Sequence, residues 1–127
     1  MDEEVVVGTW QYVLSTHAKA MCALERALGE RHGLGPSEFE VLDRIVRHDR
    51  QLRLQELCDG VHLSQSALSR VVARLEKAGL VVRHVCDSDR RGVFVSITDA
   101  GRVRHHEALP TQRAVLAEVF GDTPARI

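Results

Sequence analysis

The sequence predicts a mainly α-helical fold that carries a small pair of antiparallel strands. Apolar residues recur at helical spacing through most of the chain. Two segments rich in β-branched residues, 80–86 and 93–98, flank the charged loop 87-DSDRRG-92. The 127 residues, 44% of them hydrophobic, are enough for one globular domain with a real core. We therefore expect residues 1–127 to fold as a single domain.

The first two helices are defined by apolar spacing and by single Gly and Pro residues. The first is expected over about residues 5–28, with Gly29 as its stop. The second follows Gly35, has Pro36 in its first helical position and ends near His48. Both helices are long enough to bury one apolar face.

Two shorter helices joined by a tight turn come next. After a short extended piece at residues 52–54, residues 55–60 are expected to form one or two helical turns that end at Gly60 in the left-handed conformation. Ser64 then offers an N-cap oxygen to a helix over residues 65–79. The apolar face of that helix carries Leu68, Val71, Val72 and Leu75. This pair of helices predicts a helix-turn-helix.

The remainder of the chain predicts a hairpin and a last helix. Segments 80–86 and 93–98 should pair through the loop between them. Thr98 can cap the helix that follows, which has Pro110 in its interior, where a kink is expected. Its apolar residues are Val103, Leu109, Val115, Leu116, Val119 and Phe120.

The charge is unevenly distributed along the chain. The net charge is −1, which alone does not favour an anionic partner such as DNA. Residues 61–106, however, hold 8 Lys and Arg against 4 Asp and Glu, whereas residues 1–60 hold 7 against 11. The helix-turn-helix and the hairpin therefore form the basic part of the chain.

The outer face of the helix over residues 65–79 is small and polar. Ser66, Ser69, Arg70, Ala73 and Lys77 lie opposite the apolar face, with Gln65 and Arg74 at its flanks. Small residues let a helix approach the major groove of DNA, Gln and Ser can contact base edges, and Arg can bind guanine. For an isolated amphipathic helix a solvated face is the commoner explanation, but a hairpin whose tip carries two arginines, Arg90 and Arg91, favours DNA binding. Together they predict a winged helix that binds double-stranded DNA.

Several segments resemble the multiple-antibiotic-resistance regulator (MarR) family of bacterial transcription factors. They are 39-FEVLDRI-45, 64-SQSALSRVVARLEKAGLVVR-83, 89-DRRGVFVSIT-98 and 99-DAG-101, and the similarity covers about residues 33–120. This resemblance implies a winged-helix homodimer on a pseudo-palindromic operator, usually a repressor that is released by a small ligand or an oxidant.

The resemblance also implies roles for individual residues. Residues 64–74 match the recognition helix, Asp89 matches the aspartate that orients neighbouring arginines, and Arg91, more than Arg90, matches the arginine that reaches the minor groove. We therefore expect the DNA-binding residues to be Ser64, Gln65, Ser66, Ser69, Arg70, Arg74, Asp89, Arg90 and Arg91.

The family's dimer is built from its first and last two helices. The resemblance therefore assigns about residues 1–32 and 99–127 to dimerisation and about 33–98 to the winged helix-turn-helix. The sixth helix of the family would follow residues 121–126, and the sequence does not contain it. The interface is expected to rely on the first and fifth helices or on a shortened tail.

Regulation is less clearly indicated by the sequence. A small ligand is expected between the dimer helices and the winged helix, lined by Trp10, Leu14 and His17. A redox- or metal-responsive switch at Cys22 is the alternative. The reactive cysteine of the family's peroxide-sensing branch would, however, fall near Gln11, and a lone cysteine is more often a small buried hydrophobe. The other two cysteines, Cys58 and Cys86, are expected in the core.

Other function classes find little support. No phosphate loop, GxSxG or HExxH motif is present, so no catalytic residue, enzyme activity or cofactor is predicted. No pair of histidines has the i, i+4 spacing of a helical metal site. No apolar run is long enough to span a membrane, and the start 1-MDEEVVVGTW-10 is acidic, so we expect a cytoplasmic protein without membrane contact. A winged helix used for protein contact would suit an acidic or apolar outer face, which the sequence lacks.

Overall fold

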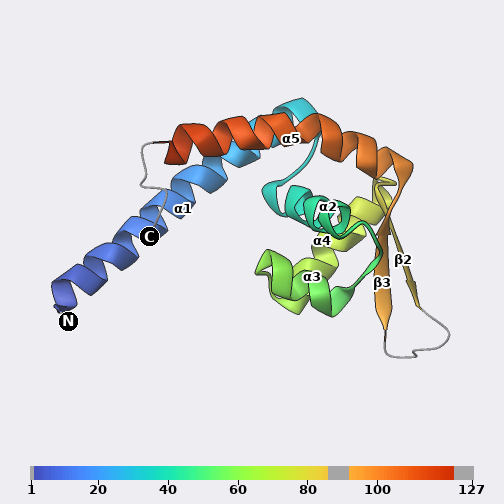
Figure 1. Ribbon diagram of the computed structural model, residues 1–127, viewed down its shortest axis with the longest axis horizontal. Helices are drawn as coiled ribbons and strands as arrows, with labels where there is room; N and C mark the ends of the chain where they lie inside the picture. Colours follow the sequence, from blue (N-terminus) through green and yellow to red (C-terminus); the bar gives the residue numbers. More distant parts are fainter. Residues whose placement is uncertain (1, 86–91, 122–127) are drawn as a thin grey trace.

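The computed structural model describes residues 2–85 and 92–121. Its elements are α1 Glu3–His32, α2 Pro36–His48, β1 Leu52–Arg53, α3 Leu54–Val61, α4 Gln65–Lys77, β2 Val81–Val85, β3 Val93–Ile97 and α5 Asp99–Phe120. Figure 1 shows α2, α3, α4 and the sheet as one compact group, with α1 projecting from it as a long arm. Helix α5 runs from the sheet back to α1. The predicted mainly helical fold with a small antiparallel sheet is confirmed.

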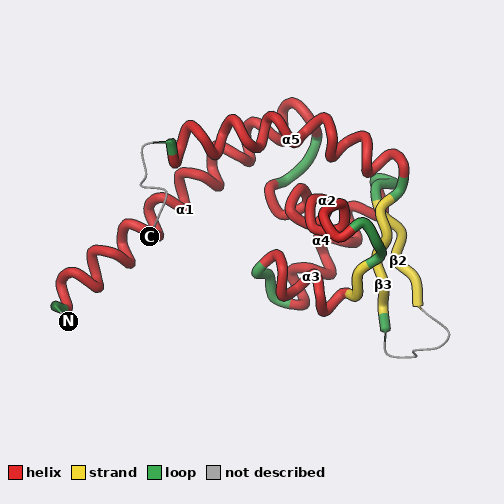
Figure 2. Tube along the Cα trace, viewed as in Figure 1, coloured by secondary structure: helices red, strands yellow, loops and turns green. Residues whose placement is uncertain are grey.

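Three short strands form one antiparallel sheet in the order β1–β3–β2 (Figure 2). Strand β2 pairs with β3 along its whole length, up to Val85 and Val93, which confirms the predicted hairpin. Leu52 of β1 pairs with Val95 of β3. The extended piece before α3 is therefore a third strand of the same sheet, and it ties the helix-turn-helix to the hairpin.

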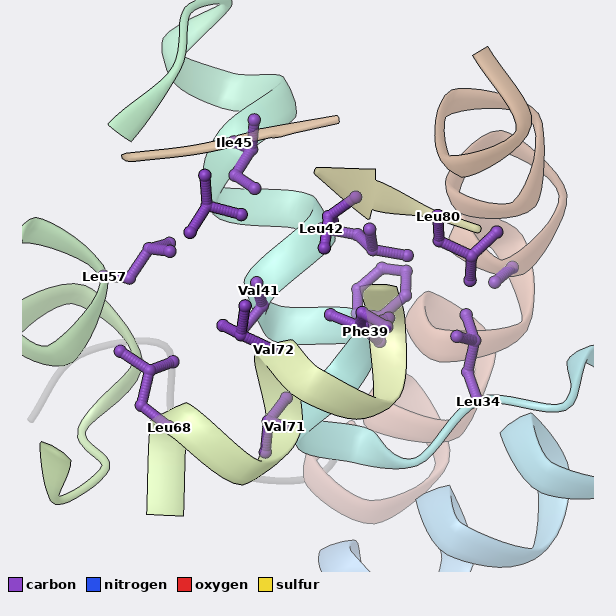
Figure 3. Close-up of a cluster of buried hydrophobic side chains, with 14 of the residues drawn as sticks. Leu34, Phe39, Val41, Leu42, Ile45, Leu57, Leu68, Val71, Val72 and Leu80 are labelled. Carbon is purple, nitrogen blue, oxygen red and sulfur yellow. The ribbon is translucent and has the colours of Figure 1, made fainter. Parts of the chain in front are cut away.

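The core of the winged helix lies between α2, α3, α4 and the sheet (Figure 3). Phe39, Leu42 and Ile45 of α2 are each at most 1% exposed and form its centre. Burying a side chain of this size contributes about 1.5–3 kcal/mol. The other large, fully buried side chains are Leu28, Leu34, Val41, Leu52, Leu57, Leu68, Val72, Leu75 and Leu80. The packing of α4 against this core fixes which of its faces is turned outward.

Side-chain caps begin two of the helices where the sequence predicts them. Ser64 Oγ accepts a hydrogen bond from the Ala67 N–H at 3.2 Å, and Thr98 Oγ1 accepts one from the Gly101 N–H at 3.0 Å. Each bond satisfies a backbone donor that has no partner inside its helix. Gly35 precedes α2 with Pro36 in the first helical turn, as predicted.

Two predicted helix stops are wrong. Helix α1 continues through Gly29 and ends at Gly33, which has a φ of 64°. Helix α3 continues through Gly60 and ends at His62, with a φ of 59°. A glycine within a helix costs only about 1 kcal/mol, which packing can offset. In α3 the gain is close packing, because a Cβ at Gly60 would overlap the guanidinium of Arg44.

The buried face of α5 agrees with the predicted one in part. Val115 is buried, and Leu109, Leu116 and Val119 pack against the core, as predicted. Val103 is 58% exposed and Phe120 is 39% exposed, so the prediction is wrong for these two. The buried residues that were not predicted are Gly101, His105, Ala108 and Gln112. Residues two apart lie about 200° apart around a helix, so Val103 faces away when His105 faces inward. The helix is continuous through Pro110.

The N-terminal half of α1 contacts little of the described chain. Its first buried residue is Ala20. Seven large apolar or aromatic residues before it are at least 43% exposed: Val5, Val6, Val7, Trp10, Tyr12, Val13 and Leu14. This is an unusually apolar exposed surface for one short segment.

Candidate nucleic-acid interface

Helix α4 has one buried and one exposed face. Leu68, Val71, Val72 and Leu75 are buried against the winged-helix core, as predicted. Ser66, Arg70, Ala73 and Lys77 on the opposite side are exposed, and Ser69 is half-buried. Gln65 and Arg74 at the flanks are exposed as well. The structure therefore brings the predicted helix residues onto one outer surface, which we call the α4 outer face.

The first turn of α4 combines short hydroxyl side chains with a longer amide. Ser64 Oγ lies 3.3 Å from Ser66 Oγ and also caps the helix. Gln65 extends from the same turn and is exposed. No acidic residue lies in this turn. Hydroxyl and amide groups of this kind can donate to and accept from base edges without repelling phosphates.

The cations of the α4 outer face are free of acidic partners within the described residues. Arg70, Arg74 and Lys77 form no ion pair with any described side chain. The neighbouring acid, Glu76, is occupied by β2 instead: its Oε2 accepts from the Arg83 backbone N–H at 3.0 Å, and its Oε1 lies 3.8 Å from the Arg83 guanidinium. Three positive charges thus remain available to a polyanion.

The three predicted wing residues, Asp89, Arg90 and Arg91, lie outside the described residues, as does Cys86. The DNA-binding roles of Asp89, Arg90 and Arg91 stay predictions, and so does the place of Cys86 in the core.

A cluster on the sheet was missed by the sequence analysis. The Arg53 guanidinium of β1 lies over the Phe94 ring of β3, 5.1 Å from its centroid. His84, which pairs with Phe94 from β2, stacks on the same ring with 6.1 Å between centroids. His84 Nε2 also lies 2.5 Å from Gln51 Oε1. No sequence signal joins Arg53 and Gln51 to the hairpin, because their contacts with Phe94 and His84 depend on β1 lying beside β3.

Arg50, also near β1, does not add a free charge. It pairs with Glu56, with 2.8 Å between Nη2 and Oε2. This hydrogen bond, followed by one from the Arg53 backbone N–H, lowers the pKa of Glu56 to about 2. The pair joins β1 to the first turn of α3.

The described cavities lie between α1 and α5 and do not include the predicted ligand residues. One, of about 500 Å³, is lined by Arg31, His32, Gly33, Arg104 and Glu107. A second, of about 580 Å³, is lined mainly by Lys19, Cys22, Arg26, Arg31, Thr111 and Glu118. Trp10, Leu14 and His17 are exposed farther along α1. Neither of these two cavities therefore contains the predicted ligand residues, whose role stays a prediction.

The cysteines differ from expectation in one case. Cys58 is partly buried and packs against the core, as expected. Cys22 is exposed, so the expectation of a buried hydrophobe is wrong for it. The reason is its position, because it faces away from the side of α1 that carries the buried residues Ala20 and Leu24.

Comparison with known proteins decides the family. A model of the MarR family matches residues 32–92. The chain is 33% identical over 90 residues to the HTH-type transcriptional regulator MhqR of Bacillus subtilis, covering 71% of this chain and 61% of that protein. The chain belongs to the MarR family. The HTH-type transcriptional repressor MdtR of the same organism is 30% identical over 88 residues, which are 69% of this chain and 56% of that one.

Solved structures of MarR-family proteins share the whole described fold. AbsC, a MarR family transcriptional regulator from Streptomyces coelicolor, superposes with a TM-score of 0.83 at 28% identity, covering 99% of this chain and 85% of that chain. Sco3205 from the same organism, solved in complex with DNA, gives a TM-score of 0.86 at 28% identity, covering 99% and 79%. The MarR-type chain described here spans less than two thirds of the length of its two Bacillus relatives.

No helix in the described part of this MarR-family chain is long and apolar enough to cross a membrane. Residues 2–85 and 92–121 contain no group of three His, Cys, Asp or Glu side chains placed to hold a metal ion.

Proposed function

We propose that this chain is a sequence-specific transcriptional regulator that binds double-stranded DNA as a homodimer on a pseudo-palindromic operator. The α4 outer face carries this proposal, because it combines short hydrogen-bonding side chains with cations that no described acid neutralises. Its relatives are named as transcriptional regulators, one of them a repressor. Action as a ligand-responsive repressor in the bacterial cytoplasm is part of the same proposal.

In this proposal, α4 enters the major groove with its N-terminal turn toward the bases. Gln65, Ser66 and Ser69 contact base edges, while Arg70 and Arg74 bind guanine or nearby phosphates. The wing arginine Arg91 enters the adjacent minor groove. The divided charge of the chain supports this placement, since the basic residues 61–106 form the side that meets DNA.

The homodimer is supported by the exposed apolar residues at the start of α1. Val6, Trp10 and Val13 lie on one side of the helix at i, i+4 and i+7, and each is at least 46% exposed. A second copy of the chain would remove this surface from water. A two-fold dimer presents two α4 helices to half-sites about one helical turn apart, which is why an inverted repeat is expected.

The proposed effector is a small molecule bound near α1 and α5. The two cavities there offer enough room, and a ligand in either would contact α5 directly. Trp10, Leu14 and His17 remain part of the proposal, because a partner subunit that covers α1 would enclose them.

The test of DNA binding is selection of a duplex from a random-sequence library by the purified chain. The selected sequences should contain an inverted repeat, and sedimentation should give two chains per duplex. Selection of no common sequence, or one chain bound to a single half-site, would contradict the proposal.

The dimer is tested by placing a charge on the exposed apolar side of α1. Trp10→Glu should give a monomer in sedimentation at concentrations where the wild type is a dimer, because the charge would be buried without a partner. Ser15→Glu adds the same charge on the opposite side of the helix, at another exposed position, and should leave the dimer intact. Equal behaviour of the two variants would place the interface elsewhere.

A redox switch at Cys22 is a second candidate, favoured by the exposure of this thiol. Affinity for the selected duplex should be measured before and after mild peroxide treatment of the wild type and Cys22→Ser. A large loss in the wild type that is absent in Cys22→Ser supports the switch. An unchanged affinity in both excludes it and leaves the small-molecule effector.

A further inference from the structure

Helix α5 connects the winged helix to the α1 arm. Its first half packs against the winged helix, where Gly101 meets the backbone of Leu80 and Ala108 is fully buried. Its second half packs along α1, where Thr111 and Val115 line a cavity together with α1 residues. The first half of α5 also contacts the end of α1, because Arg104 donates to the His32 carbonyl oxygen at 2.9 Å, and α1 contacts α2 directly. A rotation of the winged helix relative to α1 would therefore change contacts of both α1 and the first half of α5 (Figure 1).

The longest side chain in the buried part of this contact is a histidine. Between Asp99 and Ala108, the buried α5 residues are Gly101, His105 and Ala108. Gly101 and Ala108 pack closely but carry no polar side chain, so neither can form a side-chain hydrogen bond across this contact. His105 is 6% exposed and extends from α5 toward α2.

His105 contacts two side chains of α2, and one of these is held in turn by a third. Its Nε2 lies 2.8 Å from Asp43 Oδ1, and its ring stacks on Phe39 with 5.3 Å between centroids and 16° between planes. Because a carboxylate only accepts hydrogen bonds, Nε2 carries the proton that joins the two residues. Asp43 Oδ2 is occupied by Arg47 Nε at 2.8 Å, which fixes the carboxylate from the other side.

The hydrogen bond between His105 and Asp43 requires a particular direction and distance, whereas the apolar contacts around it do not. Apolar packing depends mainly on buried area, whereas a hydrogen bond weakens steeply with distance and angle. Both partners are buried, so water cannot replace the bond once it breaks. The exposed pair between Arg102 and Asp49, at 3.6 Å, lies in the same contact but is open to solvent and is correspondingly weak.

We propose that His105 and Asp43 are positioning residues that fix the angle between the winged helix and α5. In the homodimer this angle sets the separation of the two α4 helices, and thereby the spacing of half-sites that the protein accepts. The inference rests on the proposed function, because it requires a dimer on two half-sites. One base pair of spacing corresponds to about 3.4 Å along DNA. A rigid contact between α5 and the winged helix, which we call the α5 joint, would resist this displacement.

The first test compares two duplexes. One is the duplex selected from the random library, and the other has one base pair inserted between its half-sites. The wild type should lose about tenfold or more in affinity on the longer duplex, as expected when base contacts in one half-site are displaced. His105→Leu, which removes the hydrogen bond, should lose less than about threefold, because a freer joint adapts to the new spacing.

Two further variants separate positioning from packing. His105→Gln keeps an amide N–H at nearly the same reach and should restore the wild-type preference. His106→Leu, at the exposed neighbouring position, should leave it unchanged. A wild-type spacing preference in a folded His105→Leu would overturn the inference. If His105→Leu does not fold, the affinities of Asp43→Asn and His105→Gln for the two duplexes decide the inference. Asp43→Asn weakens the acceptor and should relax the spacing preference, whereas His105→Gln retains a donor and should keep it.

The second test does not need DNA. Residual dipolar couplings measure the orientation of α4 relative to the first half of α5 in the free protein. The wild type and His105→Gln should give one orientation, and His105→Leu should give averaged, smaller couplings for α4 while α4 itself stays helical. Unchanged couplings in His105→Leu would overturn the inference even if the chain bound no DNA, so failure of the proposed function and failure of the joint can be told apart.

Discussion

Gly101 lies where the first turn of α5 passes over the backbone of Leu80. A Cβ at this position would overlap the Leu80 carbonyl oxygen and approach the Ile97 side chain. The absence of a side chain at one residue therefore determines how closely α5 meets the turn between α4 and β2. Gly29, within α1, has no atom near the position of its missing Cβ.

These two glycines give a matched pair of substitutions. Gly101→Ala should lower the free energy of unfolding by about 1–3 kcal/mol, because the overlap involves backbone atoms that cannot move aside. Gly29→Ala should raise it by about 0.5–1 kcal/mol, because alanine is the better helix former and the space is free. Denaturant unfolding of both variants measures the difference, and a stable Gly101→Ala would show that the contact is looser than described.

The lowered pKa of Glu56 predicts that the free energy of unfolding depends on pH. Its pKa is about 2 in the folded protein, lowered by the hydrogen bond from Arg50 and then by the Arg53 N–H, against an ordinary value of 4.5. A lowered folded-state pKa contributes stability above the unfolded-state pKa, and that contribution is lost as pH falls from about 4.5 toward 2. The contribution is modest, about 0.2–1 kcal/mol, because both side chains are more than a third exposed to solvent.

The measurement is the unfolding free energy of the wild type and Glu56→Gln as a function of pH. The difference between them should be largest above pH 5, shrink below pH 4.5, and decrease with added salt. A difference that stays constant down to the acid end of this range would contradict the assignment of the shift to Glu56.

Among the elements, α4 was the most predictable from sequence, and the C-terminal ends of helices were the least. The spacing of Leu68, Val72 and Leu75 indicates which face of α4 is buried, and hence which face is free. The ends of α1 and α3 were mispredicted, because Gly29 and Gly60 look like stops when tertiary packing is unknown. The pairing of β1 with β3 was also not predicted, since a two-residue strand has no periodicity of its own.

The N-cap of α4 can be tested separately from its outer face. Ser64→Ala should lower the free energy of unfolding by about 1 kcal/mol, because the Ala67 N–H loses its acceptor. Ser64→Asp supplies another acceptor and should recover most of this loss, while adding a negative charge toward DNA that weakens binding. Thermal unfolding alongside duplex affinity distinguishes the two effects, and an unchanged stability in Ser64→Ala would show that the cap contributes little.

For the whole molecule, sequence patterns predicted the parts but not how they are joined. The winged helix and the long terminal helices follow from apolar spacing and turn residues. The buried pair of His105 and Asp43 does not, because a histidine and an aspartate 62 positions apart carry no pattern that links them. The exposure of Cys22 likewise depends on where α1 contacts α5, which no local pattern states.

The distribution of charge over the whole molecule explains how a chain of net charge −1 can suit DNA. The unpaired cations Arg70, Arg74 and Lys77 lie on one helix face, whereas the first 60 residues carry the excess of acid. A local excess of positive charge on this face can attract a polyanion even though the whole chain is slightly acidic.

We propose that the α4 outer face and the wing contact DNA in different ways. The decisive measurement is the affinity for the selected duplex and for a scrambled duplex, at several salt concentrations, for Gln65→Ala and Arg91→Ala. Gln65→Ala should cost about 1–3 kcal/mol on the selected duplex and little on the scrambled one, because it removes a base contact. Arg91→Ala should weaken binding to both and lower the salt slope by about one unit. Equal losses on both duplexes for Gln65→Ala, or no loss for Arg91→Ala, would contradict this division.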